Sequence, residues 1–96
     1  MPAYRFDGTR LKEGGRVVAN VRGDHVRSGT GGSVVCNLRD DRIREGTGGR
    51  VMFNLRGDDI REGTGSRKVA SLRDVDRDID GPGRVVKAAL WLYFVR

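Results

Sequence analysis

The fold is decided by Arg42-Ile-Arg-Glu-Gly-Thr-Gly-Gly-Arg-Val-Met-Phe-Asn-Leu-Arg-Gly-Asp58, a stretch that recurs along the chain. Residues 25–41 carry a closely similar copy, and residues 59–75 carry a more divergent one. Residues 3–24 follow the same pattern, with two loop residues missing between Gly14 and Gly15. A pattern that returns at a fixed interval, here 17 residues, predicts one structural unit built several times.

Each unit predicts two short strands and two turns. In the copy quoted above, the longer strand is expected at 50–55 and a shorter one follows at 59–62, since Val, Ile, Leu and aromatic residues stand there between Gly and Asp. The Arg-Gly-Asp-Asp link at 56–59 has the composition of a tight turn, and Gly-Thr-Gly-Gly at 46–49 suits a looser one. Two strands and two turns per unit predict an antiparallel meander.

Alternation along the strands predicts which face is buried. In the long strands the predicted core positions are Val17, Ala19, Val21, Val34, Cys36, Leu38, Val51, Phe53, Leu55, Lys68, Ala70 and Leu72. The opposite, half-polar face carries Val18, Asn20, Val35, Asn37, Met52, Asn54, Val69 and Ser71. Each short strand is expected to bury one residue: Leu11, Val26, Ile43 and Ile60.

A single hairpin cannot bury its own apolar face, so neighbouring hairpins are expected to close around a shared axis. Closure would also remove exposed strand edges. We therefore expect a mainly β fold in which the hairpins of residues 3–73 form a shallow, pseudo-symmetric antiparallel barrel or ring. Residues 1–96 are long enough for one domain with one modest core.

The pattern changes after Arg73. Residues 74–83 predict a longer, acidic turn, and the apolar segment 84–96 has two interpretations. As a strand it continues the repeat, because Gly83-Arg-Val-Val matches Gly15-Arg-Val-Val. As a helix it would be apolar on nearly all sides and so would have to be buried. We favour a helix at the centre of the ring, because the predicted inward-facing side chains of the ring are small.

Composition limits the partners and the compartment. The chain has a formal net charge of +6, with 16 arginines among its 19 basic residues, which favours an anionic partner. The one cysteine excludes an intramolecular disulfide. No signal-peptide pattern opens the sequence, and the apolar run Val85–Val95 is much shorter than the ~20 residues of a membrane-spanning helix. We expect a cytoplasmic protein with no transmembrane segment.

Three motifs have simpler explanations than the function they suggest. Residues 76–81 match the first half of a calcium-binding loop, but Lys87 stands where a glutamate is required, so a solvated acidic turn is preferred. The Gly-Thr-Gly-Gly stretches lack the lysine and the following helix of a phosphate-binding loop. The Arg-Gly-Asp tripeptides at 22–24 and 56–58 match a cell-adhesion motif, but they stand where the repeat requires a turn.

The sequence offers no set of residues for catalysis or metal binding. His25 is the sole histidine, and Cys36 occupies a predicted core position. No Ser/His/Asp or Cys/His combination can be assembled from these residues. We therefore expect a protein that is not an enzyme and holds no cofactor.

Arginine recurs at three positions of the unit, and the repeat would turn each position into a ring of like charge. The candidate anion-binding residues belong to two of these sets, Arg22, Arg39, Arg56 and Arg73 before the tight turn, and Arg27, Arg44 and Arg61 (with Lys12) in the short strand. The third set is Arg16, Arg50, Arg67 and Arg84. The alternative is that neighbouring carboxylates pair with these arginines at the surface for little net energy.

Phospholipid head groups are the favoured anionic partner, because rings of basic side chains concentrate positive potential. An acidic protein, or self-assembly into a homo-oligomer through the tail or a strand edge, is the second hypothesis. Nucleic acid comes third, because only Tyr4, Phe6 and Phe53 lie within the repeats and provide no platform for stacking bases.

The hairpin units of residues 3–73, with a glycine-rich link, an apolar strand and a second short strand, resemble the beta-flower repeat proteins. In these small bacterial proteins about four or five hairpins surround an axis. Their shape is similar to the phosphoinositide-binding tubby-type barrel, in which strands wrap a central apolar helix. The resemblance implies that residues 84–95 are this helix. It implies no functional residues, since the family has no established biochemical function.

Overall fold

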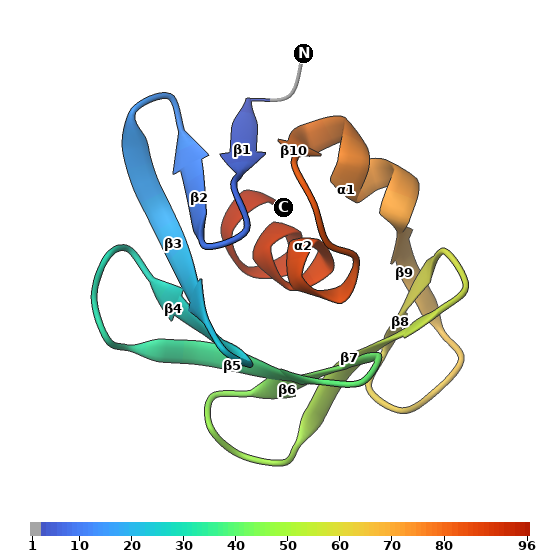
Figure 1. The fold of residues 1–96 in the computed structure, drawn as a ribbon. Coiled ribbons are helices and arrows are strands. Elements are labelled where there is room, and N and C mark those ends of the chain that lie inside the picture. Colours follow the sequence, from blue (N-terminus) through green and yellow to red (C-terminus); the bar gives the residue numbers. More distant parts are fainter. Residues whose placement is uncertain (1–2) are drawn as a thin grey trace.

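The computed structural model describes residues 3–96. Ten strands form one curled sheet in the order β10-β1-β2-β3-β4-β5-β6-β7-β8-β9 (Figure 1). Neighbouring strands are antiparallel except β1 and β10, which run parallel. The strands are β1 Tyr4–Phe6, β2 Arg10–Glu13, β3 Arg16–Arg22, β4 His25–Ser28, β5 Val34–Arg39, β6 Arg42–Glu45, β7 Val51–Arg56, β8 Asp59–Glu62, β9 Lys68–Ser71 and β10 Ile79–Asp80. The fold is therefore mainly β, as predicted.

The sheet is open, so the prediction of a closed barrel is wrong. Within residues 3–96 the edge strands β9 and β10 do not pair with each other, and helix α1, Leu72–Asp78, lies between them (Figure 1). The chain leaves the sheet at Ser71, whose backbone N–H donates to Asp74 Oδ2 at 3.1 Å. A carboxylate that accepts from the N-cap backbone is typical of a helix start. Leu72, expected at a core position of a strand, begins this helix instead.

Residues 74–83 were expected to form an acidic turn, yet they contribute to α1 and then to β10. The short strand β10 pairs with β1 through Tyr4↔Ile79 and Arg5↔Asp80. Val75 and Ile79 are fully buried. Two apolar residues four positions apart explain why this acidic segment packs onto the core and does not extend into solvent.

The core positions predicted for the short strands are confirmed, because Leu11, Val26, Ile43 and Ile60 are all fully buried. The long strands bury fewer residues than predicted. Ala19, Cys36, Leu55 and Ala70 are buried, whereas Val21, Leu38 and Phe53 among others are half-buried.

Lys68 is not in the core. The pairing of β8 with β9 shifts register between Ile60 and Arg61, which places Lys68 opposite Arg61. From there Lys68 Nζ reaches Asp59 Oδ1 at 3.2 Å, and the lysine side chain stays exposed. The same shift follows Leu11, Val26 and Ile43 in the earlier strands. A β-bulge of this kind increases the local twist and bends the strand, which helps the sheet to curl.

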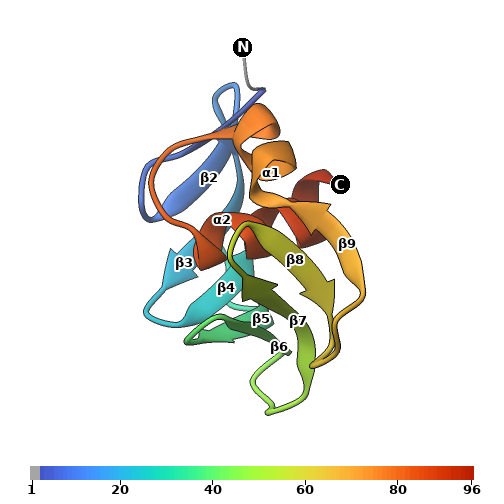
Figure 2. The same ribbon diagram turned by 90° about the vertical axis from the view of Figure 1, so that its right-hand side faces the viewer.

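The C-terminal segment is helical, in agreement with the favoured interpretation. Helix α2, Val85–Leu90, continues into a π-helical segment, η1, Trp91–Val95. Figures 1 and 2 show both lying inside the curl of the sheet. Ala88, Ala89 and Leu90 are fully buried, and α2 contacts β4, β5 and β6. Small alanines allow the helix to approach the sheet closely.

Two polar contacts fasten this central helix to α1. Lys87 Nζ donates to Asp76 Oδ1 at 2.7 Å, and Trp91 Nε1 donates to Asp78 Oδ2 at 2.8 Å. Lys87 is only 7% exposed, so its partner offsets part of the cost of burying a charge. These carboxylates were expected in a solvated turn, but their role is to anchor the helix.

Gly81 is the position where a side chain is least tolerable. Its φ is +140°, and a Cβ placed there would overlap the carbonyl oxygen of Phe6. We predict that Gly81→Ala separates β10 from β1 and lowers the free energy of unfolding by at least ~2 kcal/mol. Gly15→Ala is the control, because Gly15 has open space around its Cβ position and no positive φ. Chemical denaturation measures both variants, and equal stability of the two would contradict this account.

Candidate anion-binding face

The short-strand arginines lie opposite asparagines on the outer face of the sheet. The register pairs Asn20↔Arg27, Asn37↔Arg44 and Asn54↔Arg61. All three arginines are half-buried. Arg44 Nε donates to Asn37 Oδ1 at 2.9 Å, and Arg61 Nη2 lies 3.6 Å from Asp59 Oδ2. These side chains therefore cover the sheet as well as carrying charge.

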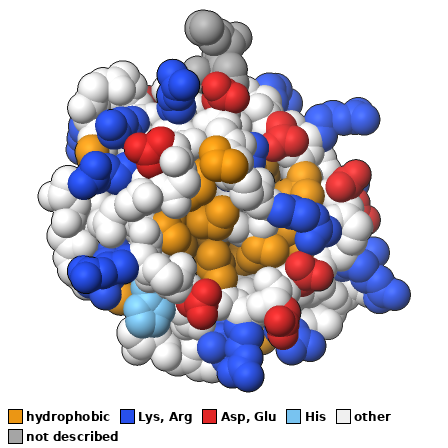
Figure 3. Space-filling view, viewed as in Figure 1, with side chains coloured by type: hydrophobic (Ala, Val, Ile, Leu, Met, Phe, Trp, Pro, Cys, Tyr) orange, Lys and Arg blue, Asp and Glu red, His pale blue; other side chains and the backbone are white. Residues whose placement is uncertain are grey.

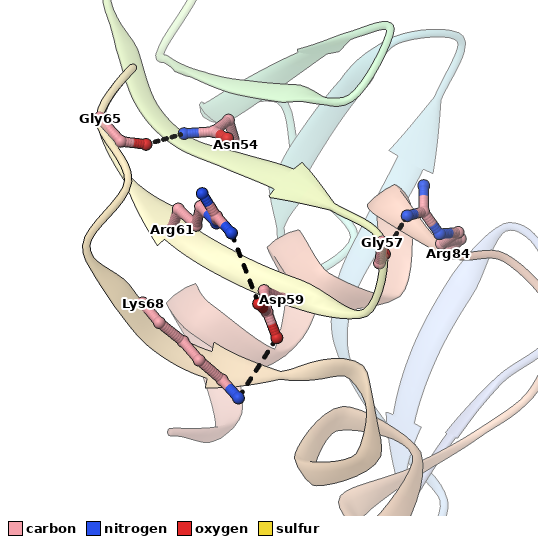
Figure 4. A network of polar contacts seen from close by, with 7 residues as sticks. All are labelled: Asn54, Gly57, Asp59, Arg61, Gly65, Lys68 and Arg84. Carbon is pink, nitrogen blue, oxygen red and sulfur yellow. Dashed lines mark hydrogen bonds and ion pairs between the residues drawn. The ribbon is translucent and has the colours of Figure 1, made fainter.

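The same asparagines shape the glycine-rich loops. Asn37 Nδ2 donates to the carbonyls of Gly46 and Gly48 at 2.7 and 3.0 Å. Asn20 and Asn54 make the equivalent contacts, and Figure 4 shows the bond from Asn54 to Gly65 beside Arg61. One asparagine thus satisfies two loop carbonyls.

Backbone N–H groups of the glycine-rich loops donate hydrogen bonds to nearby backbone carbonyls. The N–H groups of Gly46 and Gly48 donate to the carbonyls of Val35 and Glu45 at 3.1 and 2.9 Å, and the other two long loops repeat this arrangement. A phosphate-binding loop needs such N–H groups free to point at the ligand. The geometry therefore agrees with the interpretation of these glycines as turn residues.

The arginines before the tight turns form the second candidate set. Arg22, Arg39 and Arg56 end β3, β5 and β7 and are exposed. Each is followed by a two-residue turn whose first residue has a positive φ: Gly23 at 60°, Asp40 at 54° and Gly57 at 61°. Arg73 was assigned to this set, but it lies in α1 and not before a tight turn.

In the third set of recurring arginines, one member does not occupy the position that the repeat predicts. Arg16, Arg50 and Arg67 stand at the start of a long strand or in the loop before it, and all are exposed. Arg84 lies instead beside the tight turns, where Nη1 donates to Asp41 Oδ1 at 3.1 Å and Nη2 donates to the carbonyl of Gly57 (Figure 4). Its role is to fix the start of α2.

The charges segregate between the two ends of the hairpins. We call the loop rim the charged residues within two positions of the loops 14–15, 29–33, 46–50 and 63–67, together with Arg96 at the end of η1. Its members are Lys12, Glu13, Arg16, Arg27, Arg44, Glu45, Arg50, Arg61, Glu62, Arg67, Lys68 and Arg96. Nine are basic and three acidic, which leaves six positive charges. Since the whole chain carries +6, the charges outside the loop rim balance.

Two aromatic side chains, Phe53 and Tyr93, lie next to the loop rim. Phe53, which pairs with Glu62 across β7 and β8, meets Tyr93 edge to face, with ring centroids 6.3 Å apart. The guanidinium carbon of Arg96 lies 5.8 Å from the Phe53 centroid, within cation–π range. Burial raises the pKa of Tyr93, and the neighbouring Cys36 and Glu45 add to this. Basic and aromatic groups are therefore combined at this end of the molecule.

The two residues that the sequence considered for catalysis, Cys36 and His25, lie in different surroundings. Cys36 is fully buried, and burial raises the pKa of its thiol to about 12, so the reactive thiolate does not form near neutral pH. His25 lies opposite Arg22 and Asn37 on the outer face. Within residues 3–96, no three His, Cys, Asp or Glu side chains are placed to hold a metal ion.

No protein-family model matches this chain, and no curated protein or solved structure matches it. None of the helices in residues 3–96 is long and apolar enough to cross a membrane.

Sequence reasoning found the arginines but missed how the charge is distributed. The signal was present, because aspartates stand at the tight turns of each unit and a single glutamate precedes three of the loops. Counting both signs at each end of the hairpin would have distinguished the basic end from the balanced one.

The loop contacts of Asn37 lead to a stability prediction. Asn37 is only 4% exposed, so Asn37→Ala leaves the carbonyls of Gly46 and Gly48 without their donor. We expect this variant to lose about 1–3 kcal/mol of unfolding free energy. Asn20→Ala is the matched control, since Asn20 is half-exposed, its second bond is 3.4 Å long, and water can replace it. Thermal or urea unfolding that ranks Asn20→Ala as the more damaging change would contradict the assignment.

Proposed function

We propose that this chain is a non-enzymatic binding domain that docks onto an anionic lipid surface through its loop rim. One observation carries the proposal: the net charge of six positive units lies at the loop rim, while the remaining charges balance. A basic residue near an anionic membrane contributes on the order of 1 kcal/mol of attraction. Asp59, which lies outside the loop rim, partly neutralises Arg61 and Lys68. The excess of basic charge that remains at this end would hold the domain at such a surface and orient it.

The exposure of three loop-rim arginines also supports the loop rim as the contact surface. Arg16, Arg50 and Arg67 are exposed. Within residues 3–96 no ion pair with a carboxylate occupies them. Arg27, Arg44 and Arg61, which the sequence singled out, contribute charge from a half-buried position behind them. In this proposal Arg22, Arg39, Arg56 and Arg73 lie outside the contact, because acidic residues balance the charge around them.

The aromatic groups favour a lipid surface over another polyanion. Tyr93, Phe94 and Val95 are half-buried at the end of η1, next to Arg96 and Phe53. Amphipathic aromatic side chains are favoured at membrane interfaces, where one end meets lipid and the other meets water. The edge-to-face packing of Phe53 against Tyr93 leaves little flat ring surface for stacking bases.

We also propose that the hairpins are copies of one unit arranged around an axis, as in the beta-flower proteins that the sequence resembles. Recurrence of contacts at 17-residue intervals supports this. The backbone bonds Leu38 N–H to Asp24 O, Leu55 N–H to Asp41 O and Leu72 N–H to Asp58 O are each 2.8 Å. Equivalent geometry at equivalent positions is what duplicated units would produce.

A charge-matched pair of variants tests the function. We expect the triple variant Arg16→Gln/Arg50→Gln/Arg67→Gln to bind vesicles of phosphatidylcholine with phosphatidylserine on the order of 100-fold more weakly than the natural chain, since three charges are lost. Arg22→Gln/Arg39→Gln/Arg56→Gln removes the same charge from the other end and should lose far less. Co-sedimentation at physiological salt measures both.

Two results would end the lipid proposal. One is equal loss of binding in the two triple variants, which would show that net charge alone matters. The other is equal recovery of the natural chain on vesicles of pure phosphatidylcholine. Far-ultraviolet circular dichroism checks that all variants keep the fold.

A further inference from the structure

An apolar pocket opens at the end of the molecule opposite the loop rim. Its volume is about 330 Å³, and its lining consists of three glycines with Phe6, Val21, Leu38, Pro82 and Val86. Figure 3 looks onto this end and shows hydrophobic side chains gathered at the centre, surrounded by charged residues of both signs. A concave apolar surface of this size is at the lower end of the range for small-molecule sites.

One short side chain, Val21, adds to the width of the pocket. Phe6, Val21, Leu38 and Leu55 occupy equivalent places in successive units, as the last inward-facing residue before the tight turn. Phe6 and Leu55 are 2% and 4% exposed, whereas Val21 and Leu38 are half-exposed. Valine supplies less volume than the leucine or phenylalanine of the other units, which leaves more space beside Val86 of the central helix.

The wall of the pocket is held in place at both ends. On one side Gly81 packs against the backbone of Phe6, so that no side chain fits between them. On the other side Arg84 is bound to Asp41 and to the carbonyl of Gly57. The linker 81–84, which contributes Pro82 and Gly83 to the lining, is therefore fixed, and a preformed pocket requires little ordering on binding.

The side chains that line the pocket determine which kind of ligand it can bind. It contains no charged side chain and no side-chain hydroxyl or amide, so burying a charged or strongly polar group would be costly. The surrounding charges do not favour an anion or a cation, because Arg22 and Asp24 both flank Gly23 of the lining, and Arg84 is paired with Asp41. In a symmetric dimer through this face, a second copy would bring the same hollow and would not fill it.

We infer that this pocket binds the alkyl chain of an amphiphile whose head group is uncharged. The chain lies against Val21, Leu38 and Val86, and the head group remains at the charged edge in contact with water. This site is independent of the loop rim, and it does not require the protein to bind a membrane.

Alkyl glucosides below their micelle concentrations are suitable probes, with free glucose as the headgroup control. In titrations followed by methyl NMR, we expect the signals of Val21, Leu38 and Val86 to shift. Affinity should rise with each methylene added from hexyl to octyl glucoside, by up to about four-fold, which is the gain for a fully buried methylene. Affinity that does not depend on chain length, or methyl shifts confined to Val95 beside the loop rim, would overturn the inference.

Val21→Leu tests the contribution of Val21 to the pocket without a disruptive change, because leucine occupies the equivalent sequence position in three other units (Leu38, Leu55 and Leu72). We expect this variant to bind octyl glucoside at least ten-fold more weakly, with an unchanged or higher melting temperature. Val69→Leu is the matched control, at a half-buried valine of β9 outside the pocket, and should bind as the natural chain does. Equal binding by Val21→Leu and the natural chain would refute the assignment.

Discussion

The structure depends on filling the inside of a strongly curled sheet whose own inward side chains are small. Ala19, Cys36 and Ala70 are the buried residues at the middle of three long strands. Such side chains cannot meet one another across the curl, and an unfilled interior would lose the dispersion contacts of every residue that lines it. The C-terminal helix supplies the missing volume, with Ala88 and Ala89 against the sheet and Leu90 and Trp91 as bulk.

This requirement explains which parts of the fold could be predicted from the sequence. The strands, their faces and the buried helix follow from periodicity, since the apolar residue of every short strand is fully buried as expected. The segment that forms α1 and β10 could not be predicted in the same way, because its sequence departs from the 17-residue repeat. The pairing of Ile79 with Tyr4 joins the two ends of the repeat region, and no local pattern in the sequence encodes such a long-range contact.

The arginines show why a recurring residue is weak evidence for function. Arg44 binds the asparagine that organises a loop, and Arg84 fastens the start of the central helix. These contacts depend on register and on the path of the linker, which the sequence pattern does not reveal. The two ends of the hairpins differ in their balance of positive and negative charge. They also differ in that the tight-turn end has an apolar pocket, whereas aromatic side chains lie at the loop end. A small sheet can thus present two chemically different faces from one repeated hairpin.

The most direct test of this account is to compare the natural chain with one that ends at Gly83, by two-dimensional amide NMR. If the helix fills the sheet, the shortened chain should show the narrow amide dispersion of an unfolded protein and should lose cooperative thermal unfolding. Adding the peptide of residues 84–96 should restore dispersion at least in part. A shortened chain that keeps the dispersed spectrum and the melting transition of the natural chain would contradict the claim that the sheet depends on its central helix.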